Sequence, residues 1–166
     1  MDENFIVKVS HFSNKTEKRR KLISLLGNIS PYIIFVLYGV FSFVELFIRK
    51  FNEPEFFIIP LIVFAVVTVI RKKLNGKRPF ELYDIPRLIS HENGEGFPSR
   101  HSACCVTISF AILTVCPEAA VLAYIVSAVI CATRVLCGVH FVKDVVAGIF
   151  SGSILWIIWF IIQASL

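Results

Sequence analysis

Two histidines in this 166-residue sequence stand beside groups that could prepare them for nucleophilic or acid–base chemistry. One of them, His140, precedes Asp144 by four residues. If a helix begins near His140, the two side chains lie one turn apart on the same face. The carboxylate could then accept a hydrogen bond from one imidazole nitrogen, which would fix the tautomer and leave the other nitrogen free to attack. The structural alternative is a pair that only caps the following helix.

The other histidine, His101, lies where a polar loop leads into an apolar segment, directly after Pro98, Ser99 and Arg100. Proline is tolerated in the first turn of a helix and serine is a good N-cap, so this stretch predicts a helix N-terminus. The unpaired backbone N–H groups of such a terminus bind anions, and a phosphate group would fit there. Alternatively, Ser99 is only a cap and His101 is only a polar residue at an interface.

Arginines in two further parts of the sequence could complete an anion site. Arg134 lies six residues before His140, and Arg78 belongs to a basic run that precedes the polar loop. The guanidinium group binds phosphate oxygens in pairs, so Arg78 and Arg134 together could clamp a phosphoryl group. The basic run consists of Arg71, Lys72, Lys73, Lys77 and Arg78. Taken alone, such a run is also typical of the positively charged flank of a membrane span.

The composition indicates an integral membrane protein. Hydrophobic residues make up 56% of the chain and charged residues only 17%, whereas charged residues are roughly 25% of a soluble domain. The net charge of +5 suits an anionic partner such as phosphate or acidic lipid headgroups. Nucleic acid is not an expected partner, because the basic residues flank apolar segments instead of lining an exposed helix. The five cysteines are interpreted as packing residues with reduced thiols.

Apolar segments of helical length predict an all-α integral membrane bundle with about five transmembrane helices. The segments cover residues 31–47, 56–70, 99–116, 119–136 and 145–162. A short interfacial N-terminal helix is expected before Pro31, because a proline breaks a helix. Two crossings separate the polar loop at 74–97 from the turn at 134–144, so both lie on one membrane face. All candidate residues can therefore meet at one end of the bundle.

The order and spacing of these residues resemble the three-part signature of the type 2 phosphatidic acid phosphatase superfamily, whose soluble relatives include vanadium haloperoxidases. The three parts are Arg71-x6-Arg78-Pro79, Pro98-Ser99-Arg100-His101 and Arg134-x5-His140-x3-Asp144. The resemblance covers about residues 56 to 162. These residues are the expected catalytic core of a single membrane-embedded domain at 22–166, which follows a polar basic flank at 1–21.

Four positions depart from the family pattern, and none of them removes a group that would make or break a bond. The first motif normally opens with lysine. Here Arg71 stands at that place, and the adjacent Lys72 is the alternative. Arg100 replaces the usual glycine but still provides the backbone N–H. Thr133 stands where serine commonly precedes the arginine, and Val142 replaces a frequent proline.

The resemblance implies a membrane-embedded lipid phosphatase that requires no metal and no other cofactor. His140 would attack phosphorus to form a phosphohistidine, and Asp144 would orient it. His101 would protonate the leaving oxygen and then activate the water that cleaves the intermediate. The groups that would hold the phosphoryl oxygens are Arg71 or Lys72, Arg78, Ser99, the Arg100 backbone N–H and Arg134. The nearby carboxylates form no spaced magnesium cage.

The sequence is compatible with several substrates and with either membrane face. The lipid could be phosphatidic acid, phosphatidylglycerol phosphate or a polyprenyl diphosphate, and a phosphotransferase or a non-catalytic carrier of anionic lipid is the alternative function. The small size fits a bacterial cell membrane, and no oligomeric state is predicted. All but two of the 17 Lys and Arg residues would share one face, which favours a cytoplasmic site. Members of the family more often act on the extracytoplasmic face.

Overall fold

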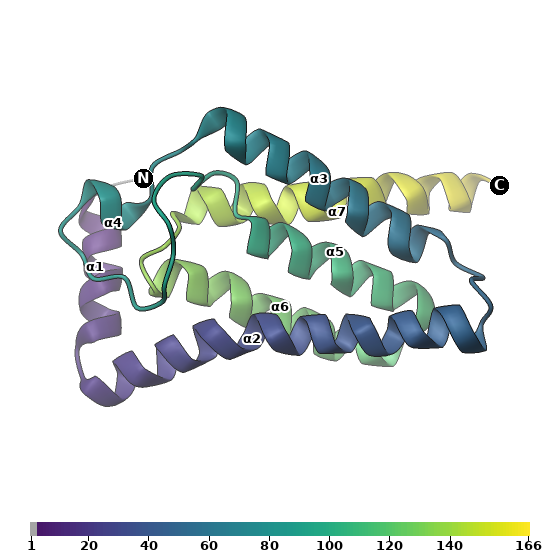
Figure 1. Cartoon of the computed structure of the whole chain (residues 1–166), viewed down its shortest axis with the longest axis horizontal. Helices are drawn as coiled ribbons and strands as arrows, with labels where there is room; N and C mark the ends of the chain where they lie inside the picture. The colour runs from purple at the N-terminus through teal and green to yellow at the C-terminus, as the bar shows by residue number, and fades with distance from the viewer. Residues whose placement is uncertain (1–2) are drawn as a thin grey trace.

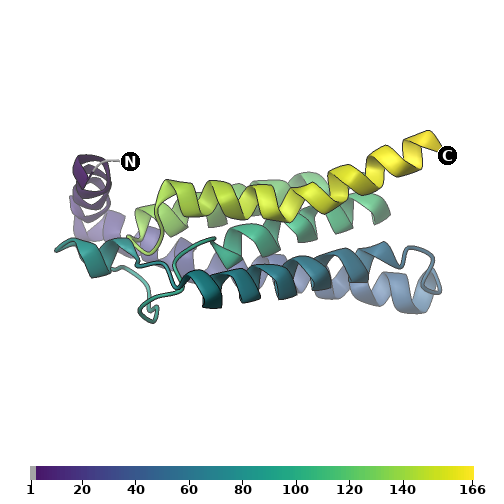
Figure 2. The ribbon, with the colours of Figure 1, turned by 90° about the horizontal axis from the view of Figure 1, so that it is seen from above.

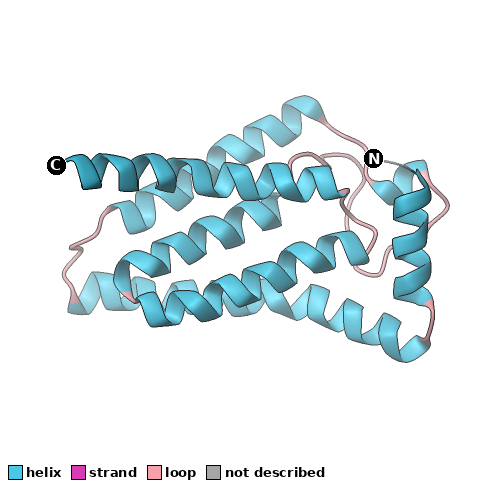
Figure 3. Cartoon of the chain, turned by 180° about the vertical axis from the view of Figure 1, so that it is seen from behind, coloured by secondary structure: helices cyan, strands magenta, loops and turns pink. Residues whose placement is uncertain are grey.

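The chain folds into helices that are joined by short turns and one long loop. The computed structural model describes residues 3–166, and this range contains no β-strand (Figure 3). The helices are α1 (Glu3–Asn14), α2 (Glu17–Phe43) with the π-helical turn η1 (Val44–Ile48), α3 (Glu55–Leu74), α4 (Pro79–Leu82), α5 (Arg100–Val115), α6 (Pro117–Leu136) and α7 (Val142–Ser165). The long helices α2, α3, α5, α6 and α7 run side by side (Figure 1), which confirms the predicted all-α bundle.

α5 occupies the middle of the bundle (Figures 1 and 2), where it packs against α3, α6 and α7. Its sequence is apolar or small on nearly every side, so it can be buried almost all round. Ala111 is fully buried, and Trp156 of α7 donates a hydrogen bond from Nε1 to Thr107 Oγ1 at 2.9 Å. Because His101 lies in the first turn of α5, the central position of this helix brings His101 to the middle of one end of the bundle.

Large apolar side chains cover the outside of the bundle. Examples are Leu25 and Val36 on α2, Leu61 and Phe64 on α3, Val121 and Ile125 on α6, and Phe150 and Ile161 on α7. A continuous apolar surface of this kind is unfavourable in water and suits hydrocarbon. Among the described helices, three are long and apolar enough to cross a membrane, namely Glu17–Ile48, Pro117–Leu136 and Val142–Ser165, and α5 is a shorter apolar helix. The protein is therefore an integral membrane protein.

α2 continues without interruption through Pro31, so the predicted break there is wrong. A proline inside a helix has no N–H to bond the carbonyl oxygen four residues earlier, which here belongs to Gly27. In this structure Arg134 Nη2 donates to the Gly27 carbonyl oxygen instead. The tertiary contact replaces the missing bond, so the helix does not have to end. The short N-terminal helix is instead α1, which crosses the end of the bundle beside the start of α2 (Figures 1 and 2).

Two glycines of α7 set its distance from α5. A Cβ at Gly152 would lie 2.5 Å from the carbonyl oxygen of Ala103, and a Cβ at Gly148 would lie 2.9 Å from Ser102 Cβ. Small residues at a spacing of four allow two helices in a membrane to approach closely. The close approach brings the beginnings of the two helices together, where the Ser99 N–H donates to the Asp144 carbonyl oxygen at 2.9 Å.

We expect the Gly152→Ala variant to unfold with a free energy about 1–3 kcal/mol lower than that of the wild type, because the added methyl group must push α7 away from α5. Thermal or denaturant unfolding of the purified protein in detergent measures this difference. Gly39→Ala is the matched control, since a Cβ at Gly39 would meet no heavy atom within 4 Å. That variant should be as stable as the wild type or slightly more stable. Equal unfolding of the two variants would contradict the close α5–α7 packing.

Candidate active site

The candidate residues lie together at one end of the bundle, on the left in Figure 1. α3 and α6 reach this end with their C-termini, whereas α5 and α7 begin at it. The loop at 75–99 lies at the same end. Antiparallel helices alternate in direction, so short stretches from distant parts of the sequence meet where these helices start and stop. The structure therefore gathers all three motifs at one site.

His140 and Asp144 form the predicted pair at the start of α7. Their side chains are buried, with 1% and 2% exposed. The Asp144 carboxylate accepts a hydrogen bond from the Phe141 N–H at 2.8 Å and lies 3.6 Å from His140 Nδ1. The carboxylate thus caps the helix and also faces the imidazole, so the capping and orienting interpretations describe one arrangement. The 3.6 Å distance between the carboxylate and His140 Nδ1 is slightly too long for a hydrogen bond. Such distances in unliganded sites often shorten when substrate binds.

Arg78 contacts the other nitrogen of the same imidazole. Its Nη1 lies 3.2 Å from His140 Nε2, and its Nε donates to the Gly94 carbonyl oxygen at 2.9 Å. Because a guanidinium only donates, Nε2 must carry the lone pair and Nδ1 the proton that faces Asp144. Burial, followed by the charges of Arg78 and Arg71, lowers the pKa of His140 well below its ordinary value. His140 is therefore neutral, and its Nε2 lone pair faces the Arg78 guanidinium.

Arg71 occupies the basic position of the first motif. Its side chain is buried, and its Nη1 donates to the Pro98 carbonyl oxygen at 2.9 Å. The Glu95 carboxylate lies 3.9 Å from Arg71 Nε. Lys72, the next residue along α3, is exposed. Consecutive helical residues point about 100° apart, so only one of the two can face the site. The structure puts Arg71 there and leaves Lys72 outside.

Ser99 and Arg100 form the start of α5. The buried Ser99 hydroxyl accepts hydrogen bonds from the Ser102 hydroxyl at 3.0 Å and the Ser102 N–H at 3.4 Å, so it caps the helix. Contact of this hydroxyl with phosphate stays a prediction. The Arg100 guanidinium lies 5.6 Å from the centre of the Phe64 ring. Its backbone N–H belongs to the first helical turn, where an α-helix provides no acceptor.

A cavity of about 360 Å³ opens between the loop and the start of α5. The charged and titratable side chains that line it include Arg71, Arg78, His91, Glu95, Arg100 and His101. Several buried nitrogens in or near it have no hydrogen-bond partner among residues 3–166, namely Arg71 Nε, His91 Nδ1, Arg134 Nε and His140 Nδ1. Unpaired buried donors are costly, so their concentration around one cavity is typical of a site that binds an anion. The arrangement can hold a phosphoryl group beside a neutral histidine.

His91 is a site residue that the sequence analysis missed. Its ring centre lies 5.7 Å from that of His101 and 6.1 Å from that of His140, so three imidazoles share the site. Burial lowers the pKa of His91 to about 4, and the charges of Arg78 and Arg134 act in the same direction. The only available signal was a histidine in the loop between the first two motifs, and such a loop has no fixed spacing.

The PAP2 superfamily model matches residues 56–165, which is more than half of the chain and includes every predicted site residue. The chain belongs to the PAP2 superfamily. α1 and α2 precede the part of this PAP2 chain that the family model matches.

Two solved structures have the same PAP2 fold. The crystal structure of Aquifex aeolicus LpxE is 22% identical, with 92% of each chain covered and a TM-score of 0.73. The crystal structure of a transmembrane PAP2-type phosphatidylglycerolphosphate phosphatase from Bacillus subtilis is 21% identical, with 98% of this chain and 94% of that chain covered and a TM-score of 0.50. A search of curated protein sequences found no match. The chain thus has the membrane lipid phosphatase fold of the PAP2 superfamily.

The low pKa of His91 predicts a loss of stability in acid. As the pH falls below about 6.5, the unfolded chain binds a proton at this residue before the folded PAP2 chain does. The free energy of unfolding should therefore decrease until the pH reaches the folded pKa of about 4. Unfolding curves of the wild type and His91→Gln in detergent, at about pH 7 and about pH 5, measure this contribution. Between about pH 7 and about pH 5, the free energy of unfolding should fall less for His91→Gln than for the wild type. An equal fall in both proteins would contradict the burial of a neutral His91 imidazole.

Proposed function

We propose that this protein hydrolyses a lipid phosphate or lipid diphosphate through a phosphohistidine intermediate. The observation that carries the proposal is the environment of His140. One ring nitrogen faces a carboxylate at 3.6 Å, and the other lies 3.2 Å from the Arg78 guanidinium in a buried cationic site. The carboxylate can fix the tautomer that leaves a lone pair on Nε2, and a bound anionic phosphoryl group would draw the Arg78 N–H from this lone pair to its own oxygen.

In the first step, the lone pair of His140 Nε2 attacks phosphorus, and a P–N bond forms as the P–O bond to the lipid breaks. His101 gives its proton to the leaving oxygen. Asp144 stabilises the positive charge that develops on the His140 imidazole. In the second step, His101 takes a proton from water, the resulting hydroxide attacks phosphorus and the P–N bond breaks. The products are inorganic phosphate and the free His140 imidazole.

The positive charges of the site would stabilise the transition state. Arg71, Arg78 and Arg134 can donate to the phosphoryl oxygens, and the start of α5 adds backbone N–H groups. These groups are fixed by the fold before substrate binds, so little reorganisation is needed during the reaction. Because the side chains themselves supply the charge, the proposed reaction needs no metal.

An apolar groove next to the site supports a lipid as the substrate. The groove has a volume of about 370 Å³ and is lined by side chains of α2, α3 and α5, among them Phe35, Leu61, Phe64 and Ile108. Phe64 lies under the Arg100 guanidinium, which also lines the polar cavity. A headgroup in the cavity could therefore continue into an apolar tail along the outside of the bundle.

Phosphate release by the purified protein in detergent tests the proposal. Phosphatidic acid, phosphatidylglycerol phosphate and a polyprenyl diphosphate would be compared with a chelator present. The similarity in fold to a phosphatidylglycerolphosphate phosphatase makes the second lipid the first to try. We expect phosphate release from at least one of these lipids. Rapid quenching during turnover should also trap a phosphorylated protein whose phosphate is lost in acid. Transfer to an added alcohol instead of water would identify a phosphotransferase, and no turnover of any lipid would favour a binding protein.

We expect phosphatase activity to persist at mildly acidic pH. Only the neutral form of His140 can attack phosphorus, and the pKa of this imidazole lies well below its ordinary value. Protonation therefore inactivates the enzyme only at a pH below about 6.5. The value of kcat/KM at about pH 6 should be at least about half of that at about pH 7.5, after correction for the separately titrated substrate phosphate, because protonation of the proposed proton donor His101 can only increase it. A fall of the corrected kcat/KM with a midpoint at about pH 6.5 would contradict this prediction.

A further inference from the structure

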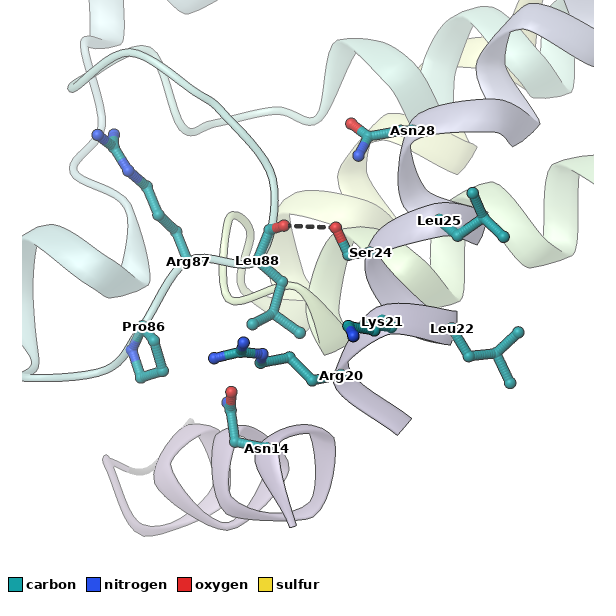
Figure 4. Close-up of a pocket in the computed structure, with 10 residues that line it drawn as sticks. All are labelled: Asn14, Arg20, Lys21, Leu22, Ser24, Leu25, Asn28, Pro86, Arg87 and Leu88. Atoms are coloured by element: carbon teal, nitrogen blue, oxygen red, sulfur yellow. Dashed lines mark hydrogen bonds between the residues drawn. The ribbon is translucent and has the colours of Figure 1, made fainter. Parts of the chain in front are cut away.

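Helix α2 contacts the back of the candidate site, although it lies outside the part of the chain that the family model matches. Arg134 Nη2 donates a hydrogen bond to the Gly27 carbonyl oxygen. The Cys137 thiol donates to the Ile23 carbonyl oxygen, with 3.8 Å between sulfur and oxygen. The Ser24 hydroxyl donates to the Leu88 carbonyl oxygen at 2.8 Å (Figure 4). The first half of α2 is therefore joined to α6, to the turn that follows α6 and to the loop at 75–99.

The contact between Gly27 and Arg134 depends on a proline one turn later. In an α-helix the carbonyl oxygen of residue 27 would accept the N–H of residue 31, but Pro31 has no N–H. The Gly27 carbonyl oxygen is consequently available to a side chain from another helix. Gly27 allows α6 and the loop to pack closely on α2, because a Cβ there would lie 3.0 Å from Cys137 Sγ and 3.3 Å from Ile89 Cγ2.

The same device occurs a second time in the bundle, away from the site. Pro60 lies inside α3, and the carbonyl oxygen four residues earlier belongs to Phe56. The Tyr38 hydroxyl of α2 donates to this oxygen at 3.0 Å. In both helices, the carbonyl oxygen released by an internal proline accepts a hydrogen bond from a side chain of a neighbouring helix. Of these two carbonyl oxygens, only that of Gly27 accepts from a residue of the three motifs, which is Arg134.

Arg134 is the residue that this contact orients. The residue is 1% exposed, and its Nε has no hydrogen-bond partner among residues 3–166. A guanidinium is planar, so fixing one Nη on a carbonyl oxygen fixes the directions of the remaining N–H groups. A buried cation held in this way needs no rearrangement when an anion arrives.

We infer that Gly27 and Pro31 are positioning residues of the site: the carbonyl oxygen released by Pro31 holds Arg134 so that its remaining N–H groups point to the phosphoryl oxygens. This inference rests on the proposed function, because it assigns Arg134 to phosphate binding. It adds α2 to the active site, although no side chain of α2 takes part in the chemistry. A proline that only bends the helix would leave phosphate binding independent of Arg134.

The Pro31→Ala variant tests the inference, since alanine restores an N–H that competes with Arg134 for the Gly27 carbonyl oxygen. Alanine is the better helix former, so the variant should unfold at the same temperature as the wild type or higher. Its affinity for inorganic phosphate, measured from the phosphate-dependent rise in unfolding temperature, should nevertheless fall about 10-fold. Its kcat/KM for the lipid phosphate should fall about 10–100-fold. A variant with wild-type phosphate affinity would overturn the inference.

Two further variants separate positioning from a general effect on the helix. Pro60→Ala makes the same chemical change in α3 and should leave phosphate affinity unchanged. In an Arg134→Ala background, Pro31→Ala should cause no further loss of phosphate affinity, because the residue it acts through is absent. An additional loss in that background would show that Pro31 acts by another route. Failure of the proposed function is distinguishable, since the wild type itself would then release no phosphate from any lipid.

Discussion

Substitution of His140 by alanine is expected to lower kcat for phosphate release by at least about 10³-fold, because it removes the atom that forms the P–N bond. His101 cannot replace it in the proposed reaction, since its role is to transfer protons. The variant should also fail to form the phosphorylated protein. Single-turnover experiments measure both effects, with a rapid acid quench for the released phosphate and a rapid alkaline quench for the acid-labile phosphorylated protein, and they separate the chemical step from product release.

The controls for His140→Ala address folding and binding. His11→Ala changes an exposed histidine of α1 and should leave kcat unchanged. Inorganic phosphate should still raise the unfolding temperature of His140→Ala, because the arginines that would bind it are intact. Phosphate release within about tenfold of the wild type would exclude His140 as the nucleophile. Retained binding with no release in the wild type would instead support a carrier of anionic lipid.

Replacement of Arg78 by lysine is expected to reduce kcat/KM by about 10²–10³-fold, although the charge is kept. The Arg78 guanidinium donates to the Gly94 carbonyl oxygen at 2.9 Å and to the Val139 carbonyl oxygen at 3.0 Å, and it lies 3.2 Å from His140 Nε2. Nε makes the contact with Gly94 and Nη1 makes the other two, in the fixed geometry of one planar fork that a single ammonium group cannot reproduce. The lysine would neither hold the loop nor face the imidazole in the same way.

Steady-state kinetics with the best lipid substrate measures the effect of Arg78→Lys on kcat/KM. A separate measurement of the affinity for inorganic phosphate shows whether the loss lies in binding or in turnover. Lys73→Ala is the matched control, because it removes an exposed positive charge from the same end of α3. That variant should retain wild-type kcat/KM. An Arg78→Lys enzyme that is as active as the control would mean that Arg78 acts only as a diffuse charge.

The helices of the bundle could be predicted because each apolar segment carries its own signal. Residues 119–136 were expected to span the membrane, and the observed helix is Pro117–Leu136. The closeness of His140 and Asp144 was predictable from their spacing, but the shared helix face was not confirmed. α7 begins at Val142, so His140 lies in the preceding turn, and the Asp144 carboxylate faces it while it caps the helix at the Phe141 N–H. Local geometry of this kind depends only on neighbours in the sequence.

The break expected at Pro31 shows where local reasoning ends. A missing N–H counts against a helix when residues 27–31 are considered alone. The acceptor that it releases is bound by Arg134, whose position in the sequence differs from that of Gly27 by 107. No sequence rule connects the two residues, so only the packing of α6 against α2 could decide that the helix continues.

The sequence by itself determined the membrane environment, the helical bundle and the three motifs, because these follow from apolar length and from spacing within short segments. The tertiary structure decided which members of the motifs meet. It selected Arg71 over Lys72 by the rotation of α3, used the Ser99 hydroxyl as a helix cap, and brought His91 between two other histidines. These outcomes depend on how helices rotate and how a loop folds across their ends, and both are fixed by contacts between residues far apart in the sequence.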